Sequence, residues 1–177
     1  MFNYLQKTDD FIATAQYPST IYRYQKWYQT EQKYFCPIWN KRFPHWQSFK
    51  IDDKITNIIN RLQLFIDSYH DISKPKINSC LINKYPDGNH FIGPHRDSVL
   101  SFGETPTIIN LSLGATRTLL FENPIENAIK NKNNFSFELE SGSLFIMAGE
   151  SQNNYLHSIK KSDCKNTRYS LTFREFI

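Results

Sequence analysis

Three side chains that could together bind one metal ion stand out first. His95 and Asp97 lie two residues apart, and His157 follows far along the chain. Side chains two apart in a strand or extended turn project to the same side, so His95 and Asp97 could bind one ion. Two imidazoles and one carboxylate form the facial triad of non-haem Fe(II) oxygenases, which leaves metal positions open. The His-x-Asp pattern alone is weak evidence, because such short patterns also occur by chance.

A second candidate feature is the strand-like run near the C-terminus. Alternation places one apolar set on one face, Tyr169, Leu171 and Phe173, and one polar set on the other, Arg168, Ser170, Thr172 and Arg174. The apolar face accounts for packing, whereas a core does not need the two guanidiniums and two hydroxyls. Because an arginine fork matches a carboxylate bidentately, two arginines on one strand could hold both ends of a dicarboxylate. The alternative is a solvent-facing edge strand with ordinary charges.

A similar polar pair precedes the His-x-Asp motif. Asn83 and Tyr85 share one face of a predicted strand, while Cys80 and Ile82 share the other. The amide and the phenol could complete the hydrogen bonds of a bound acid. The alternative is an ordinary strand end, because a Pro-Asp-Gly turn follows at residues 86–88.

The composition limits the class of protein. The chain has 177 residues, 15% aromatic residues and a net charge of +4, which permits a polyanionic partner without requiring one. Its 3 cysteines form no C-x-x-C pair, and their odd number favours a reduced protein. No apolar run approaches the ~20 residues of a membrane span, and Met1–Asp10 lacks the order of a signal peptide. We therefore expect a soluble intracellular protein of the cytoplasm or nucleus, without a membrane partner.

The predicted elements indicate a mainly β fold with a helix near the N-terminal side. Residues 1–20 show poor periodicity and are expected to be an extended lead-in. Apolar residues recur at helical spacing within Ile51–Ile72, which predicts an amphipathic helix. Short strands bounded by turn residues follow, at Ser79–Tyr85, Thr107–Leu113, Arg117–Glu122, Phe135–Glu140, Ser143–Ala148 and Arg168–Phe176. This order predicts one domain with a β-sandwich or jelly-roll core.

Aromatic and basic residues alternate closely over residues 21–50. Such a mixture is typical of surfaces that stack on bases and meet phosphates. The candidate contacts are Tyr24, Trp27, Tyr34, Trp39 and Arg42. Strands whose aromatic side chains pack into the core are an equally good interpretation of this composition.

In combination, the motifs resemble the AlkB-type iron and 2-oxoglutarate dioxygenases, in particular their nucleic-acid-repair branch. The matching segments occur in the family's order: Asn83-x-Tyr85, Gly93-x-His95-x-Asp97, Leu111–Arg117, Ser141–Met147, the distal His157 and Arg168-x-Ser-x-Thr-x-Arg174. They cover roughly Pro44 to the C-terminus. The order of several separated motifs favours the functional interpretation over chance for each of them.

The resemblance implies a double-stranded β-helix (jelly-roll) core over residues 51–177, preceded by an extension over residues 1–50 that holds a nucleotide-recognition lid. It implies that His95, Asp97 and His157 bind Fe(II). It also assigns 2-oxoglutarate to one residue set: Asn83, Tyr85, Arg168, Ser170, Thr172 and Arg174. With O2, such an enzyme removes an N-linked methyl group from a DNA or RNA base and releases formaldehyde and succinate. The base must be single-stranded or flipped to reach the metal, and we expect a monomer.

Two positions depart from the family pattern. Ser170 stands where the family usually has Asn, which removes an amide and keeps a hydroxyl. Val99 stands where repair members usually carry an acid that contacts the exocyclic amine of the base. Because valine cannot accept that hydrogen bond, a 2-oxoglutarate-dependent hydroxylase of a protein or small molecule is the main alternative, and a non-catalytic nucleic-acid-binding relative is another.

Overall fold

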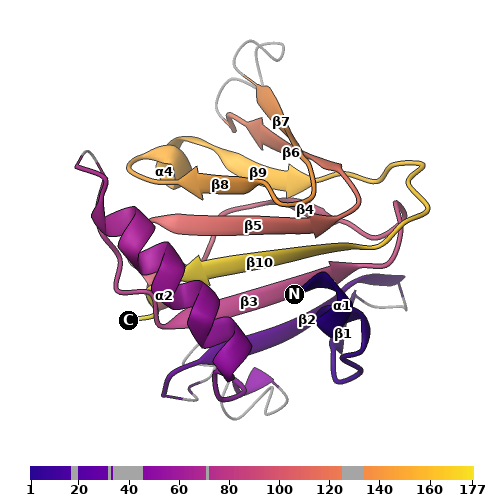
Figure 1. The fold of residues 1–177 in the computed structure, drawn as a ribbon. Coiled ribbons are helices and arrows are strands. Elements are labelled where there is room, and N and C mark those ends of the chain that lie inside the picture. The colour runs from indigo at the N-terminus through magenta and orange to yellow at the C-terminus, as the bar shows by residue number, and fades with distance from the viewer. Residues whose placement is uncertain (17–19, 32, 34–45, 71, 125–133) are drawn as a thin grey trace.

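The fold consists of two antiparallel sheets with one long helix across the outer face of the larger sheet (Figure 1). The structure is a computed structural model and describes residues 1–16, 20–31, 33, 46–70, 72–124 and 134–177. In chain order the elements are α1 (Phe2–Gln6), β1 (Ile12–Gln16), β2 (Thr20–Gln29), α2 (Asp53–Asp67), β3 (Ser79–Tyr85), β4 (Ile92–His95), α3 (Val99–Phe102), β5 (Ile108–Gly114), β6 (Arg117–Glu122), β7 (Phe135–Leu139), β8 (Leu144–Met147), α4 (Ser151–Asn154), β9 (Leu156–Ile159) and β10 (Arg168–Arg174).

The strands are shared between a larger and a smaller sheet. The major sheet has the order β1-β2-β3-β10-β5-β8, and the minor sheet has the order β4-β9-β6-β7. Residues of both sheets line one cavity, so the sheets enclose it as the two walls of a jelly roll. The predicted mainly β jelly-roll fold with one helix before its core strands is confirmed.

Helix α2 closes the apolar side of the major sheet. Its first turn is capped by Asp52, whose carboxylate accepts a hydrogen bond from the Ile55 backbone N–H at 2.9 Å. The buried stripe of α2 then packs on apolar side chains of β3 and β10, including Ile82 and Leu171, which are 0% exposed. The helix is shorter than the predicted Ile51–Ile72. Among the described residues, no helix is long and apolar enough to cross a bilayer.

The prediction of an extended lead-in over residues 1–20 was wrong. The segment forms α1 and β1, and Leu5 is 0% exposed within the core beneath α2. Phe2 packs edge-on against Tyr169 of β10 with ring centroids 5.6 Å apart. These elements are stabilised by contacts with distant parts of the chain, which local periodicity cannot reveal.

Strand β2 joins the N-terminal segment to the core. It pairs with β3 over six residue pairs, from Tyr24 opposite Lys84 to Gln29 opposite Ser79. Strands β1 and β2 of the expected extension over residues 1–50 are the outer strands of the major sheet. The side chains of β2 consequently form part of the cavity wall.

Candidate active site

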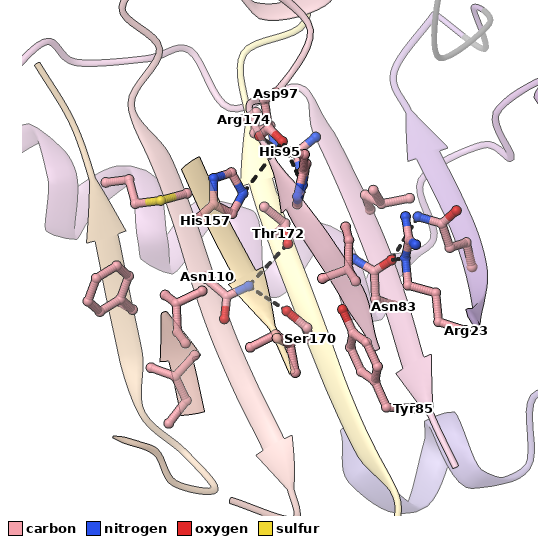
Figure 2. A pocket seen from close by; sticks show the side chains of 18 of the residues that line it. Arg23, Asn83, Tyr85, His95, Asp97, Asn110, His157, Ser170, Thr172 and Arg174 are labelled. Carbon is pink, nitrogen blue, oxygen red and sulfur yellow. Dashed lines mark hydrogen bonds and ion pairs between the residues drawn. The ribbon is translucent and has the colours of Figure 1, made fainter. Parts of the chain in front are cut away.

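The three predicted metal ligands converge at one end of the cavity (Figure 2). His95 ends β4 and lies directly opposite His157 of β9 in the antiparallel register. Asp97 follows β4, and its Oδ1 lies 3.8 Å from His95 Nε2 and 3.9 Å from His157 Nε2. The ligand atoms of all three residues lie within 4.8 Å of one another. This spacing places all three donors around one common point, as a facial triad requires.

The protonation of the three residues also suits a cation. Burial, together with the charge of His95, lowers the pKa of His157 to about 4. Burial likewise lowers the pKa of His95, so both rings are neutral near neutral pH and have a lone pair to offer. The Nδ1 of His95 lies 2.9 Å from the carbonyl oxygen of Gly93. Because a carbonyl oxygen can only accept a hydrogen bond, Nδ1 carries the proton. The unprotonated Nε2 can then bind a metal ion through its lone pair.

Arg174 ties the end of β10 to the metal site. Its Nε lies 3.1 Å from Asp97 Oδ2, and both side chains are buried. Burial alone would raise the pKa of Asp97, but the charges of Arg174 and the two histidines outweigh burial and hold that pKa below its ordinary value. The backbone N–H of Asp97 donates to Gln152 Oε1 at 2.9 Å, which fixes the carboxylate's place. Asp97 is therefore a preorganised anionic ligand.

Arg168, at the start of β10, is a buried cation that forms no ion pair with a carboxylate of the described residues. The side chain is 1% exposed, and its Nη2 donates to Ser112 Oγ at 2.8 Å. Its Nε and Nη1 are buried without a hydrogen-bond partner in the described part of the chain. Its guanidinium carbon lies 5.4 Å from the centre of the Tyr85 ring, and burial lowers its pKa to about 10. Unsatisfied donors on a buried cation fit an anionic ligand such as a carboxylate.

Asn83 is presented to the cavity by two residues that the sequence did not single out. Its Oδ1 accepts from Arg23 Nε at 2.9 Å and from Gln25 Nε2 at 2.7 Å. Both donors come from β2, where Gln25 lies opposite Asn83. With the oxygen occupied, the Nδ2 group of Asn83 can donate to a ligand. Alternation along β2 places Arg23 and Gln25 on one face, but the sequence alone does not show which face meets β3.

Asn110 is a further residue of this wall that sequence reasoning missed. It lies on β5 opposite Thr172, and its Nδ2 donates to Ser170 Oγ at 2.5 Å and to Thr172 Oγ1 at 3.1 Å (Figure 2). Its Oδ1 lies 3.4 Å from Ser112 Oγ, the hydroxyl that also accepts from Arg168. The signal was present, because Asn110 and Ser112 alternate with apolar residues in the predicted strand Thr107–Leu113.

The cavity between the sheets has a volume of about 360 Å³. The metal residues lie toward the Arg174 end of β10 and Tyr85 toward the other end, with Ser170 and Thr172 between them (Figure 2). All six residues assigned to 2-oxoglutarate line this one space: Asn83, Tyr85, Arg168, Ser170, Thr172 and Arg174. A cavity of this size suits a small dicarboxylic acid beside a metal ion.

The predicted base contacts are placed less uniformly. Trp27 is 2% exposed and packs with Leu81, Phe102 and Phe176, so its predicted role as a stacking surface was wrong. Tyr24 does not line the cavity, and its ring lies 6.0 Å from that of His90. Tyr34, Trp39 and Arg42 fall outside the described residues. Val99 begins α3 and is 53% exposed, whereas the adjacent Ser98 lines the cavity, as does Trp46, which was not among the candidates.

Comparison with known proteins agrees with this geometry. Residues 6–174 match the family described as the 2OG-Fe(II) oxygenase superfamily. DNA oxidative demethylase ALKBH2 of Arabidopsis thaliana is 27% identical over 125 residues, covering 60% of this chain and 40% of that protein. Alpha-ketoglutarate-dependent dioxygenase alkB homolog 3 is 35% identical over 102 residues in Mus musculus (55% and 36% covered) and 28% identical over 157 residues in Homo sapiens (86% and 51% covered). The chain thus spans between about a third and a half of these relatives.

A solved structure shows the same fold. "The structure of OsALKBH1" superimposes with a TM-score of 0.60 at 19% identity, covering 93% of this chain and 83% of that one. The buried triad and the paired arginines of the cavity fit the family's metal and cosubstrate, which are Fe(II) and 2-oxoglutarate, used with O2. The chain therefore belongs to the 2OG-Fe(II) oxygenase superfamily and is of the AlkB type, as its motifs predicted.

Proposed function

We propose that this protein is an Fe(II)- and 2-oxoglutarate-dependent oxidative demethylase of N-alkylated bases in DNA or RNA. The observation that carries the proposal is one cavity that holds a His-Asp-His cluster and two buried arginines on a single strand. The relatives named as DNA oxidative demethylases support the choice of substrate class.

In this proposal each side chain has a defined task. His95, Asp97 and His157 hold the metal, and Arg174 keeps Asp97 ionised beside it. Arg168 and Tyr85 bind the distal carboxylate of 2-oxoglutarate. Asn83, Ser170 and Thr172 donate to the rest of the acid, and Asn110 holds the two hydroxyls in place. When bound, iron and 2-oxoglutarate supply the oxidising chemistry with O2, and the protein supplies position and a protected pocket.

We expect the substrate to enter beside β2. Thr14, Arg23, Gln25 and Trp46 line the cavity on this side, and the last three belong to the predicted nucleotide-recognition segment, residues 21–50. A base inside a duplex cannot reach a metal buried between two sheets, so a flipped or single-stranded nucleotide is the form that we expect to bind. Arg23 and Trp46 of this segment line the cavity and offer it a cation and a ring, and a monomer is sufficient for this arrangement.

The decisive experiment is a screen of methylated oligonucleotides, DNA and RNA in parallel, read by mass spectrometry. Purified protein with Fe(II), 2-oxoglutarate and ascorbate is expected to remove one methyl mass from at least one oligonucleotide and to release formaldehyde. Turnover of 2-oxoglutarate to succinate without any such loss would contradict the proposed substrate class.

A second candidate is a 2-oxoglutarate-dependent hydroxylase of a protein or a small molecule. Val99 favours it, because this exposed side chain cannot accept the hydrogen bond of an exocyclic amine. Salt dependence separates the two candidates: binding of a polyanionic nucleic acid weakens steeply with added salt, whereas binding in a neutral peptide pocket does not.

A further inference from the structure

Arg23 brings an unneutralised positive charge to the wall of the cavity. Its Nε is used by Asn83, and its two terminal nitrogens have no hydrogen-bond or ion-pair partner among the described residues. Arg23 lines the same cavity as the metal residues His95, Asp97 and His157. In Figure 2 the Arg23 side chain lies on the β2 side of the cavity, away from Asn110 and His157. Two guanidinium donors are therefore available to a bound molecule.

The nearby carboxylates are committed to other cations. Asp97 pairs with Arg174, and Asp10 pairs with Lys26 at 2.5 Å. The cavity is lined by four arginines and one carboxylate among the described residues: Arg23, Arg96, Arg168 and Arg174 against Asp97. The sequence between residues 34 and 45 contains no Asp or Glu, so it cannot supply a neutralising acid. Fe(II) and 2-oxoglutarate carry opposite double charges and leave the excess positive charge in place.

The position beyond the metal ligand offers no negative charge either. Ser98 and Val99 follow Asp97, and of these two Ser98 lines the cavity. A valine cannot accept a hydrogen bond from an exocyclic amine, and a serine hydroxyl adds no charge. Among the described residues that line the cavity, Asp97 is the one carboxylate and is paired with Arg174, while Arg23 supplies a charge that would repel a cationic base.

Alkylated bases fall into two classes, which differ in charge and in whether an amine or a carbonyl group is next to the alkylated nitrogen. 1-Methyladenine and 3-methylcytosine are cations with an exocyclic amine donor. 3-Methylthymine, 3-methyluracil and 1-methylguanine are neutral and present carbonyl acceptors beside the alkylated nitrogen. We propose that Arg23 donates a hydrogen bond to such a carbonyl oxygen, so that the enzyme acts preferentially on neutral, carbonyl-bearing N-alkylated bases. This inference rests on the proposed function and names its substrate class.

The sharpest test uses 3-methyluracil and 3-methylcytosine in otherwise identical oligonucleotides, because these bases differ only at C4 and in charge. We expect kcat/KM for methyl removal to be at least ~10-fold higher for 3-methyluracil, which corresponds to about 1.4 kcal/mol. The same order is expected for binding measured with Mn(II) and 2-oxoglutarate in place of the active iron enzyme. Both assays are run with DNA and RNA.

Variants of two residues test which side chains cause the preference for 3-methyluracil over 3-methylcytosine. Arg23→Glu is expected to lower or reverse the 3-methyluracil to 3-methylcytosine ratio, and Val99→Glu, at an exposed position, is expected to raise activity on 3-methylcytosine alone. Arg61→Glu makes the same charge change on an exposed residue of α2 and should leave the ratio unchanged. Val99→Glu keeps the test valid if the Arg23 variant does not fold.

The outcomes separate this inference from the proposed function. Faster demethylation of 3-methylcytosine by the natural protein, or an unchanged ratio in Arg23→Glu, overturns the role of Arg23 and leaves the demethylase proposal standing. An Arg23→Gln variant that loses affinity for 2-oxoglutarate at an unchanged substrate ratio makes Arg23 a cosubstrate residue and also overturns the inference. Turnover of 2-oxoglutarate with no methyl loss from any oligonucleotide overturns both proposals.

Discussion

The two faces of β10 are equally buried, but they differ in whether the protein itself satisfies their side chains. On one face Tyr169, Leu171 and Phe173 are each at most 1% exposed and pack beneath α2. On the other face every side chain is polar, and each is at most 6% exposed: Arg168, Ser170, Thr172 and Arg174. The first face is satisfied by the protein itself. The second leaves buried guanidinium nitrogens without hydrogen bonds, so it is complete only when a ligand is bound.

This contrast teaches that burial alone does not separate core from site. Apolar burial stabilises the fold, whereas buried unsatisfied cations lower the stability of the free protein and are retained for binding. The two faces should therefore respond in opposite ways to substitution: changes beneath α2 should affect unfolding, and changes in the cavity should affect 2-oxoglutarate and the metal.

The largest expected effect is at the metal end. His95→Ala removes one of three ligands and should reduce 2-oxoglutarate turnover at least ~100-fold, because even changes to residues behind the ligands reduce activity 10- to 100-fold. Turnover is measured as succinate formation, and metal content is measured after dialysis against Fe(II). His70→Ala, an exposed histidine beyond α2, is the matched control. Retained turnover in His95→Ala would remove His95 from the metal site.

The apolar face should respond in stability instead. Leu171→Ala leaves a cavity beneath α2 and is expected to lower the free energy of unfolding by about 2–5 kcal/mol, with 2-oxoglutarate affinity nearly unchanged. Thr172→Val, one residue along and on the opposite face, should change stability by only about 1 kcal/mol and weaken 2-oxoglutarate binding. Urea unfolding and calorimetric titration of the Mn(II) form measure both quantities. Equal effects of the two variants on binding would refute the division of the strand.

The cavity face should show the opposite balance at Arg168. Arg168→Met replaces a buried cation with an apolar side chain of similar length, so the free energy of unfolding is expected to rise by about 1–4 kcal/mol. Affinity for 2-oxoglutarate should fall at least ~30-fold, because a buried charged hydrogen bond is lost. Arg61→Met on the exposed surface of α2 controls for the change of charge. A destabilised variant with normal affinity would show that Arg168 is structural.

The sequence predicted those parts of this comparison that depend on local alternation. A period of two separates the faces of residues 168–174, and the spacing of His95 and Asp97 places both on one side. Strands β4 and β9 were not predicted as elements. Their histidines were nevertheless found, since ligand chemistry identifies a histidine without its strand.

The remainder depends on pairings between distant segments. Arg23, Gln25 and Trp27 lie two residues apart and share one face of β2. Phe102 and Phe176 pack on Trp27, whereas Arg23 and Gln25 donate hydrogen bonds to Asn83. The local sequence pattern does not predict which distant residues will pack on a given side chain of the strand. For the same reason Asn110 was missed, because its partners Ser170 and Thr172 are 60 and 62 residues away in the chain.

The smallest expected effect is also the most specific to this chain. Ser170 lacks the amide that the family usually places there, and Asn110 supplies an amide to the same spot from the adjacent strand, 2.5 Å from Ser170 Oγ. By donating to both hydroxyl oxygens, Asn110 leaves the hydroxyl protons of Ser170 and Thr172 free to donate to a carboxylate. Asn110→Ser should therefore weaken 2-oxoglutarate binding by roughly 3- to 10-fold, the equivalent of about one hydrogen bond.

Exchanging the residues at positions 110 and 170 tests whether binding depends on the amide itself or on the strand that carries the amide. The double variant Asn110→Ser with Ser170→Asn returns the amide to β10 and keeps the side-chain inventory of the cavity unchanged. We expect its 2-oxoglutarate affinity to return to within about 3-fold of the natural protein, whereas Asn110→Ser alone stays weaker, which is the coupling that a double-mutant cycle measures. Calorimetry on the Mn(II) form gives the affinities. Additive losses in the double variant would show that Asn110 acts only through packing, and that the cavity face of β10 binds its ligand without help from β5.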